Sequence, residues 1–160
     1  MTPPDFESKL CPPEQLPAAL ATLRRPLVFT NGVFDILHRG HVTYLARARS
    51  LGASVLVALN TDDSVRRLGK GTDRPINPLP DRAAVVAALA SVDLVTWFDT
   101  DTPLPLILVV RPEILVKGGD WRVHDIVGAS EVRGWGGQVR SIAFEHVRST
   151  SATLARIRTS

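Results

Sequence analysis

Short apolar runs alternate with amphipathic segments along most of this chain. Five short runs, made up mostly of apolar residues, predict strands at residues 27–30, 54–59, 94–98, 114–117 and 139–144. Apolar residues at helical spacing predict helices at 41–51, 81–90 and 125–133, shorter ones ending at 68 and near 158, and another beginning at 103. Strands of this kind are typical of a parallel sheet that is buried on both faces, with the intervening helices covering it.

The chain divides into an N-terminal segment and one domain. Residues 1–25 are rich in proline, and we expect a short helix near residues 14–23 or partial disorder there. Residues 26–160 are long enough to form a single domain with its own core. We therefore expect an α/β fold, a Rossmann-like, doubly wound sheet of five parallel strands with helices on both faces.

Capping residues predict where two of the helices begin. Asp62 or Asp63 is expected to cap the short helix that ends at residue 68, because a carboxylate accepts hydrogen bonds from the first N–H groups of a helix. Thr102 followed by Pro103 predicts an N-cap with proline at the first helical position.

The segment from residue 30 to residue 41 reads Thr-Asn-Gly-Val-Phe-Asp-Ile-Leu-His-Arg-Gly-His. It lies where a strand ends and a helix begins, so free N–H groups and the positive end of the helix dipole favour an anion there. Two imidazoles, of His38 and His41, are available to donate hydrogen bonds to a phosphate, and Gly40 allows a close approach to the backbone. A zinc site fits poorly, because the chain has one cysteine and no second His or Cys cluster.

From Gly32 to His41 the sequence resembles the G-x-F-D-x-x-H-x-G-H signature of the cytidylyltransferase-like nucleotidyltransferases. The stretch from residue 28 to residue 158 further resembles the heptose 1-phosphate adenylyltransferase branch, which makes ADP-heptose. The segments that carry this second resemblance are residues 59–62, 74–82, 111–120, 136–139 and 149–151. Lys-Gly-Gly-Asp at 117–120, with the spacing of the other segments, points to the heptose branch.

The resemblance assigns roles to residues that follow the predicted strands. The residues it makes catalytic are His38, His41 and Lys117. Those it places on the nucleotide are Thr30, Asn31, Gly32, Val33, Phe34, Gly40, His41, Arg82, Ser149, Thr150 and Ser151. Those it places on the second substrate are Asp35, Lys70, Lys117, Gly118, Gly119 and Asp120. Carboxyl ends of parallel strands share one edge of the sheet, so these residues are expected to meet.

Two charged residues in this set have an ordinary structural interpretation as well. Arg82 opens a helix, and it would either pair with Asp81 or Asp99 or reach the triphosphate. Asp35 would either cap the junction or contact a lysine or a phosphate through Mg²⁺.

The glycine and hydroxyl motifs also have two interpretations. Residues 117–120 would form a plain turn or a substrate site, and residues 149–151 would cap the last helix or hold phosphates. Loop residues Arg66, Lys70 and Arg74 would close over the substrates, helped by the glycines that flank Lys70, or remain solvated surface.

The resemblance implies a definite reaction, with ATP and Mg²⁺ on one side and D-glycero-β-D-manno-heptose 1-phosphate on the other. The sugar phosphate is already an ionised nucleophile, so its oxygen would attack the α-phosphorus in line and expel pyrophosphate. A separate kinase would have to supply the sugar phosphate. Two alternatives stay open: a cytidylyltransferase-type enzyme acting on another acceptor such as glycerol 3-phosphate, and a non-catalytic nucleotide-binding module.

Composition limits the kinds of binding partner and the cellular compartment that we expect for this protein. The net charge is +3 and aromatic residues make up 6%, without the basic, aromatic-interleaved stripe of a nucleic-acid binder. The apolar runs are too short to span a bilayer, and no secretory signal opens the chain. The single Cys11 suits a reducing cytoplasm. A homodimer is a further expectation from the resemblance.

Overall fold

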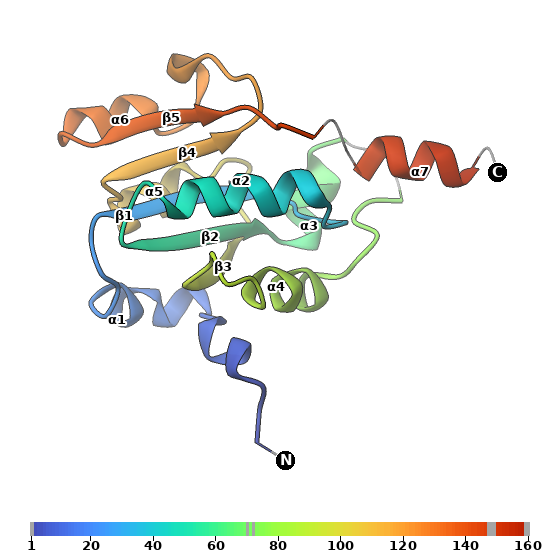
Figure 1. Ribbon diagram of the computed structural model, residues 1–160, viewed down its shortest axis with the longest axis horizontal. Coiled ribbons are helices and arrows are strands. Elements are labelled where there is room, and N and C mark those ends of the chain that lie inside the picture. Colours follow the sequence, from blue (N-terminus) through green and yellow to red (C-terminus); the bar gives the residue numbers. More distant parts are fainter. Residues whose placement is uncertain (1, 70, 72, 147–149, 159–160) are drawn as a thin grey trace.

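Five parallel strands form the centre of the computed structural model, which describes residues 2–69, 71, 73–146 and 150–158 (Figure 1). The strands are β1 (Leu27–Gly32), β2 (Ser54–Asn60), β3 (Leu94–Phe98), β4 (Ile114–Gly118) and β5 (Gln138–Ile142). They lie in the order β3-β2-β1-β4-β5 and every neighbouring pair is parallel. The predicted fold class is therefore confirmed.

Helices connect the strands and cover both faces of the sheet. They are α1 (Leu16–Leu20), α2 (Arg39–Arg49), α3 (Asp62–Arg67), α4 (Leu79–Ala87), α5 (Leu104–Val110), α6 (Ala129–Gly134) and α7 (Thr150–Arg158), with three 3₁₀ turns, η1 (Asp5–Lys9), η2 (Pro13–Gln15) and η3 (Val123–Asp125). Among the residues that the structure describes, no helix is long and apolar enough to cross a membrane.

Successive residues of each strand point to opposite faces and build two apolar cores. On one face Phe29 and Leu56 pack with Leu16 of α1 and with side chains of α5 and α6. On the other face Val28 and Val57 pack with side chains of α2 and α4. The inner strands are thus buried on both faces, which explains why they are largely apolar, whereas the edge strand β5 alternates exposed polar with buried apolar residues.

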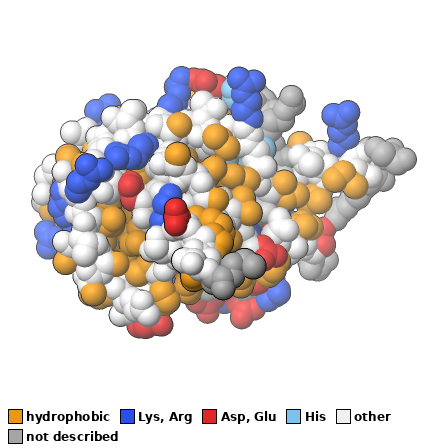
Figure 2. Space-filling view, turned by 60° about the horizontal axis from the view of Figure 1, so that its bottom comes forward, with side chains coloured by type: hydrophobic (Ala, Val, Ile, Leu, Met, Phe, Trp, Pro, Cys, Tyr) orange, Lys and Arg blue, Asp and Glu red, His pale blue; other side chains and the backbone are white. Residues whose placement is uncertain are grey.

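The N-terminal segment packs against the β3 edge of the sheet. Leu10 forms a parallel bridge with Val95, and the N–H of Cys11 donates to the Val95 carbonyl at 2.8 Å. Leu16 is 1% exposed and belongs to the core of the domain. Figure 2 views the side that carries α1 and α4 in Figure 1, with apolar side chains across its middle and basic ones mostly around its rim.

Two predicted helix caps are wrong. Thr61 caps α3 in place of Asp62 or Asp63, and its hydroxyl accepts the N–H of Ser64 at 3.1 Å. The backbone N–H of Thr61 still donates to the Phe98 carbonyl in the sheet. The bonds to the sheet therefore end at Thr61, one residue before the position that an Asp62 cap requires. At α5 the N-cap is Pro103, because the Thr102 carbonyl already closes a turn with the Thr100 hydroxyl.

Two predicted helix bounds differ as well. The helix expected from residue 81 begins at Leu79, with Pro80 in its first turn, where a missing N–H does no harm. The helix expected from residue 125 begins only at Ala129, because Gly128 has a positive φ of 86° that interrupts it.

Candidate active site

The order of the strands reverses between β1 and β4, and the carboxyl ends of these two strands carry the candidate site. In open parallel sheets ligands bind beyond the strand ends at this point. The ladder places Thr30 of β1 beside Val116 of β4, so Asn31 and Lys117 come next to each other at the edge. The site therefore contains the end of β1, the start of α2 and the end of β4.

Two imidazoles stack at the start of α2. His38 is the N-cap residue, and its ring lies 3.8 Å from the ring of His41, centroid to centroid, at 22°. Phe34 contacts His41 from another side, with ring centroids 5.1 Å apart. A Cβ on Gly40 would lie 3.1 Å from the His38 ring and from the His146 carbonyl, so a larger residue would crowd the ring. The expected approach of a phosphate to the Gly40 backbone stays a prediction.

Both imidazoles carry a buried nitrogen without a partner. The Nδ1 atoms of His38 and His41 have no hydrogen-bond partner in the described residues. Burial, and then the nearby His38, lower the pKa of His41 to about 4, and burial also lowers the pKa of His38. Both rings are therefore neutral near pH 7. Buried polar atoms without partners are rare in folded proteins, and at a strand end they indicate a ligand site.

Acidification is expected to destabilise the protein through His41. The unfolded chain binds a proton on this residue below its ordinary pKa of 6.5, whereas the folded protein does so only near 4. Stability present above pH 6.5 is therefore lost as the pH falls towards 4, by at most ~3 kcal/mol. Thermal unfolding of the wild type and His41→Gln at pH 7.5, 6 and 5 tests this. Equal losses in both proteins would contradict it.

Lys117 lies at the end of β4 between Asn31 and Trp121. Its Nζ donates to the backbone carbonyl of Asn31 at 3.4 Å and to its Oδ1 at 3.5 Å, and lies 5.9 Å from the centroid of the Trp121 ring. The lysine is half-buried, so its ammonium stays at the edge of the sheet beside the imidazole-bearing segment. This places a cation where the sequence predicted one.

The turn after Lys117 is held in shape by β5. The N–H of Gly119 donates to the Ile142 carbonyl at 2.8 Å, and Ser141 Oγ donates to the Gly119 carbonyl at 2.5 Å. Gly119 has a positive φ of 112°, and a Cβ on Gly118 would lie 2.7 Å from the Phe144 ring. The turn thus requires glycine at residue 119, the Phe144 ring leaves little room for a side chain at residue 118, and the exposed Asp120 follows them.

Residues 30–34 are less open to a nucleotide than the sequence predicted. Thr30 is fully buried, and its hydroxyl lies 2.5 Å from the hydroxyl of Tyr44, which donates to the Val116 carbonyl at 3.3 Å. Phe34 is also buried. The Thr30 side chain therefore joins α2 to β1 in this structure, and the expected contact of Thr30 with a nucleotide stays a prediction. Only Asn31, Gly32 and Val33 stay half-buried.

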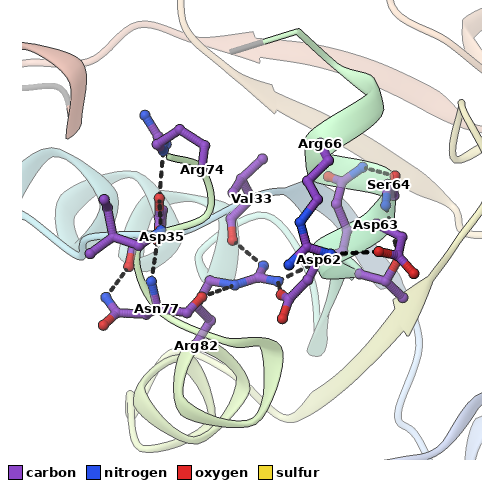
Figure 3. Close-up of polar contacts among 12 residues, drawn as sticks. Val33, Asp35, Asp62, Asp63, Ser64, Arg66, Arg74, Asn77 and Arg82 are labelled. Atoms are coloured by element: carbon purple, nitrogen blue, oxygen red, sulfur yellow. Dashed lines mark hydrogen bonds and ion pairs between the residues drawn. The ribbon is translucent and has the colours of Figure 1, made fainter. Parts of the chain in front are cut away.

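Arg82 does not reach toward the site, and neither expected ion pair forms. It is 1% exposed, and its guanidinium pairs with Asp62 at 2.6 Å in place of Asp81 or Asp99 (Figure 3). The remaining donors bond to backbone carbonyls of residues 33, 60 and 77. This geometry does not favour a direct contact with a triphosphate, because the side chain is buried and every guanidinium nitrogen already has a partner within the protein.

Asp35 is likewise turned inward. Its side chain is fully buried and accepts hydrogen bonds from Arg74 Nε at 2.6 Å and from the N–H groups of Ile76 and Asn77. Burial alone would raise its pKa, but these N–H groups and Arg74 together lower the pKa of Asp35 below its usual value. Asp35 and Arg74 are therefore engaged with each other and with backbone, and the expected contacts of Asp35 with a lysine or Mg²⁺ and of Arg74 with substrate stay predictions. The sequence gives no local sign of this pairing.

Some predicted residues cannot be placed. Lys70 and Ser149 lie outside the described residues, and so does the side chain of Ser151. Thr150 begins α7; it is buried, and its hydroxyl donates to the Ile36 carbonyl at 3.5 Å. Arg66 pairs with Asp63 at 2.5 Å on an exposed surface. No group of three His, Cys, Asp or Glu side chains in the described ranges is arranged to hold a metal ion.

The sequence is similar to a known family and to individual proteins. A model of the cytidylyltransferase-like family matches residues 29–158. A D-beta-D-heptose 1-phosphate adenylyltransferase of Bordetella bronchiseptica is 57% identical over 155 residues, which are 96% of each chain. The bifunctional protein HldE of Hahella chejuensis is 51% identical over 91% of this chain, which spans only 31% of that longer protein.

Solved structures share the fold. A lipopolysaccharide core biosynthesis protein of Thermoplasma volcanium superposes with a TM-score of 0.61 at 28% identity, over 76% of this chain and 98% of its own. A pantothenate synthetase of Thermus thermophilus superposes with a TM-score of 0.57 at 19% identity, over 83% of this chain and 61% of its own. At that identity the second likeness concerns the fold alone.

Proposed function

Because the chain belongs to the cytidylyltransferase-like family, we propose that it is an adenylyltransferase that transfers AMP from ATP to D-glycero-β-D-manno-heptose 1-phosphate. The products are ADP-heptose and pyrophosphate, for lipopolysaccharide core or a related glycan. The observation that carries the proposal is the placing of two imidazoles and an ammonium around the switch point of the sheet. The heptose 1-phosphate acceptor is supported by the relative that matches over 96% of both chains.

The chemistry requires alignment and charge neutralisation more than a new nucleophile. An oxygen of the sugar phosphate attacks the α-phosphorus of ATP, the bond to the bridging oxygen breaks, and pyrophosphate leaves with its electron pair. His38 and His41 donate hydrogen bonds to the oxygens of the α-phosphate as charge grows on them. Lys117 brings the two anionic substrates together from the other side of the switch point.

Mg²⁺ enters with ATP as part of the substrate in this proposal. The described residues offer no cluster that would hold a resident metal, and both Asp35 oxygens are bonded within the protein. The ion would shield the leaving pyrophosphate. The hydroxyls and N–H groups of residues 149–151 would hold the outer phosphates, and Asp120 and Lys70 would contact the substrates.

Pyrophosphate release measured for each nucleotide against a panel of phosphorylated acceptors tests the proposal. Turnover is expected with ATP and heptose 1-phosphate. Turnover with CTP and glycerol 3-phosphate alone would replace the heptose acceptor, and nucleotide binding without turnover for any pair would indicate a non-catalytic module.

A further inference from the structure

The segment between β1 and α2 is held by two buried arginines that the proposed chemistry does not use. We call the first of these two sets of contacts the Arg82 anchor. Its Nη1 donates to the Val33 carbonyl at 2.7 Å, its Nη2 to the Asn60 carbonyl at 2.9 Å, and its Nε to the Asn77 carbonyl at 3.0 Å. Asp62 balances the charge. A single planar guanidinium therefore joins the ends of β1 and β2 to the loop that precedes α4 (Figure 3).

The second anchor lies two residues further along the segment. Asp35 receives Arg74 and the N–H of Asn77 at 2.9 Å, while the Asn77 side-chain amide donates to the Asp35 carbonyl at 2.7 Å. Since the Asn77 carbonyl accepts from Arg82, both anchors belong to one continuous network. Buried charges of this kind are costly unless every partner is in place, so the network specifies one arrangement of the segment.

Phe34 lies between the two anchors in a conformation that it would not keep alone. Its φ is +48°, in the left-handed region that bulky residues rarely adopt. Such a conformation persists only where the surroundings hold it on both sides, here at Val33 and Asp35. The Phe34 ring contacts the His41 ring, so the backbone conformation at Phe34 influences where the two imidazoles lie.

We propose that Arg82 and Asp35 are positioning residues for the transfer reaction, which hold the imidazole pair in place through Phe34 and its neighbours. The proposal rests on the proposed function. It differs from a phosphate-binding role, because neither side chain is exposed to a substrate. Positioning errors of about an ångström commonly lower turnover by ~10²-fold, so kcat is the sensitive quantity.

Arg82→Lys tests the first anchor. Lysine keeps the charge opposite Asp62 but cannot donate to three separate carbonyls in a plane. We expect kcat to fall by roughly 10–10²-fold, with the KM for ATP changed by less than about threefold. Arg67→Lys is the matched control, because the Arg67 guanidinium likewise contacts more than one group, here the carboxylates of Asp99 and Asp101, but on the exposed surface. Its kcat should equal that of the wild type.

Asp35→Asn tests the second anchor against Asp93→Asn. Asp93 makes the same kind of contacts at the opposite end of the sheet, accepting the N–H of Val55 at 2.7 Å and lying 3.5 Å from Arg49. Both substitutions neutralise a carboxylate that caps backbone and pairs with an arginine. Only Asp35→Asn is expected to lower kcat, by roughly tenfold or more, with a smaller change in KM.

Imidazole ¹⁵N resonances supply a readout that does not depend on turnover. The chain has four histidines, and two of them are expected to shift in Arg82→Lys and Asp35→Asn but not in the controls. Folded variants with wild-type kcat and unshifted resonances would overturn the proposal. A raised KM for ATP with unshifted resonances would also overturn it, in favour of direct contact. If the wild type turned over no substrate pair, the proposed function would fail while the resonances still tested the positioning.

Discussion

Replacing His41 by alanine is expected to lower kcat by ~10²–10³ while the protein remains folded. The imidazole is neutral near pH 7, since burial lowers its pKa to about 4, and it therefore offers one N–H donor without carrying a fixed charge. A donor aimed at charge that develops in the transition state contributes mainly to kcat. The KM for ATP should change less than kcat.

His124→Ala is the matched control for this experiment. The His124 side chain is 67% exposed and pairs only with the neighbouring Asp125 in the described residues. Steady-state pyrophosphate release and thermal unfolding should be measured on both variants. His41→Asn, which keeps a side-chain donor, separates loss of the donor from loss of packing against Phe34. Near wild-type turnover in His41→Ala would remove the imidazole from the mechanism.

Lys117→Met is expected to lower kcat/KM by about 10², because it removes the cation and keeps the apolar stem. Two anionic substrates have to approach each other at the end of β4, and a half-buried ammonium there offsets their repulsion. Both KM values should rise along with the fall in kcat, since the ammonium attracts the bound substrates as well as the transition state.

Lys9→Met controls for the loss of a lysine elsewhere. Lys9 Nζ donates to the Leu89 carbonyl at 3.1 Å, far along the chain from the strand ends of the site. Its kinetic constants should match those of the wild type. Should Lys117→Met also match them, the cation beside Asn31 would have only a structural role.

The strands were predictable because most of their residues are buried on both faces of the sheet and are therefore apolar. The run at residues 54–59 is apolar except for Ser54, and β2 is buried throughout. The helix starts were harder to predict, because the identity of the capping residue depends on where the hydrogen bonds of the preceding strand end. Thr61 shows this directly, since its N–H still belongs to the sheet.

The edge of the sheet that carries the catalytic candidates was predictable for a different reason. Parallel topology brings the carboxyl ends of the strands to one edge, so the segments with His38, His41 and Lys117 were expected at that edge once the strands were assigned. The roles of Arg82 and Asp35 were not predictable in this way. Their partners lie in the loop at residues 74–77, whose irregular path no periodicity describes.

The bridge between Leu10 and Val95 has a consequence for solubility. An open sheet has two edges whose unpaired backbone groups can recruit strands from other molecules. At the β3 edge, the N-terminal segment occupies the Val95 carbonyl and places η2 against the strand. The opposite edge strand, β5, carries exposed polar residues at Gln138 and Arg140, which discourage such pairing. The proline-rich segment and these polar side chains thus protect the two edges from aggregation by different means.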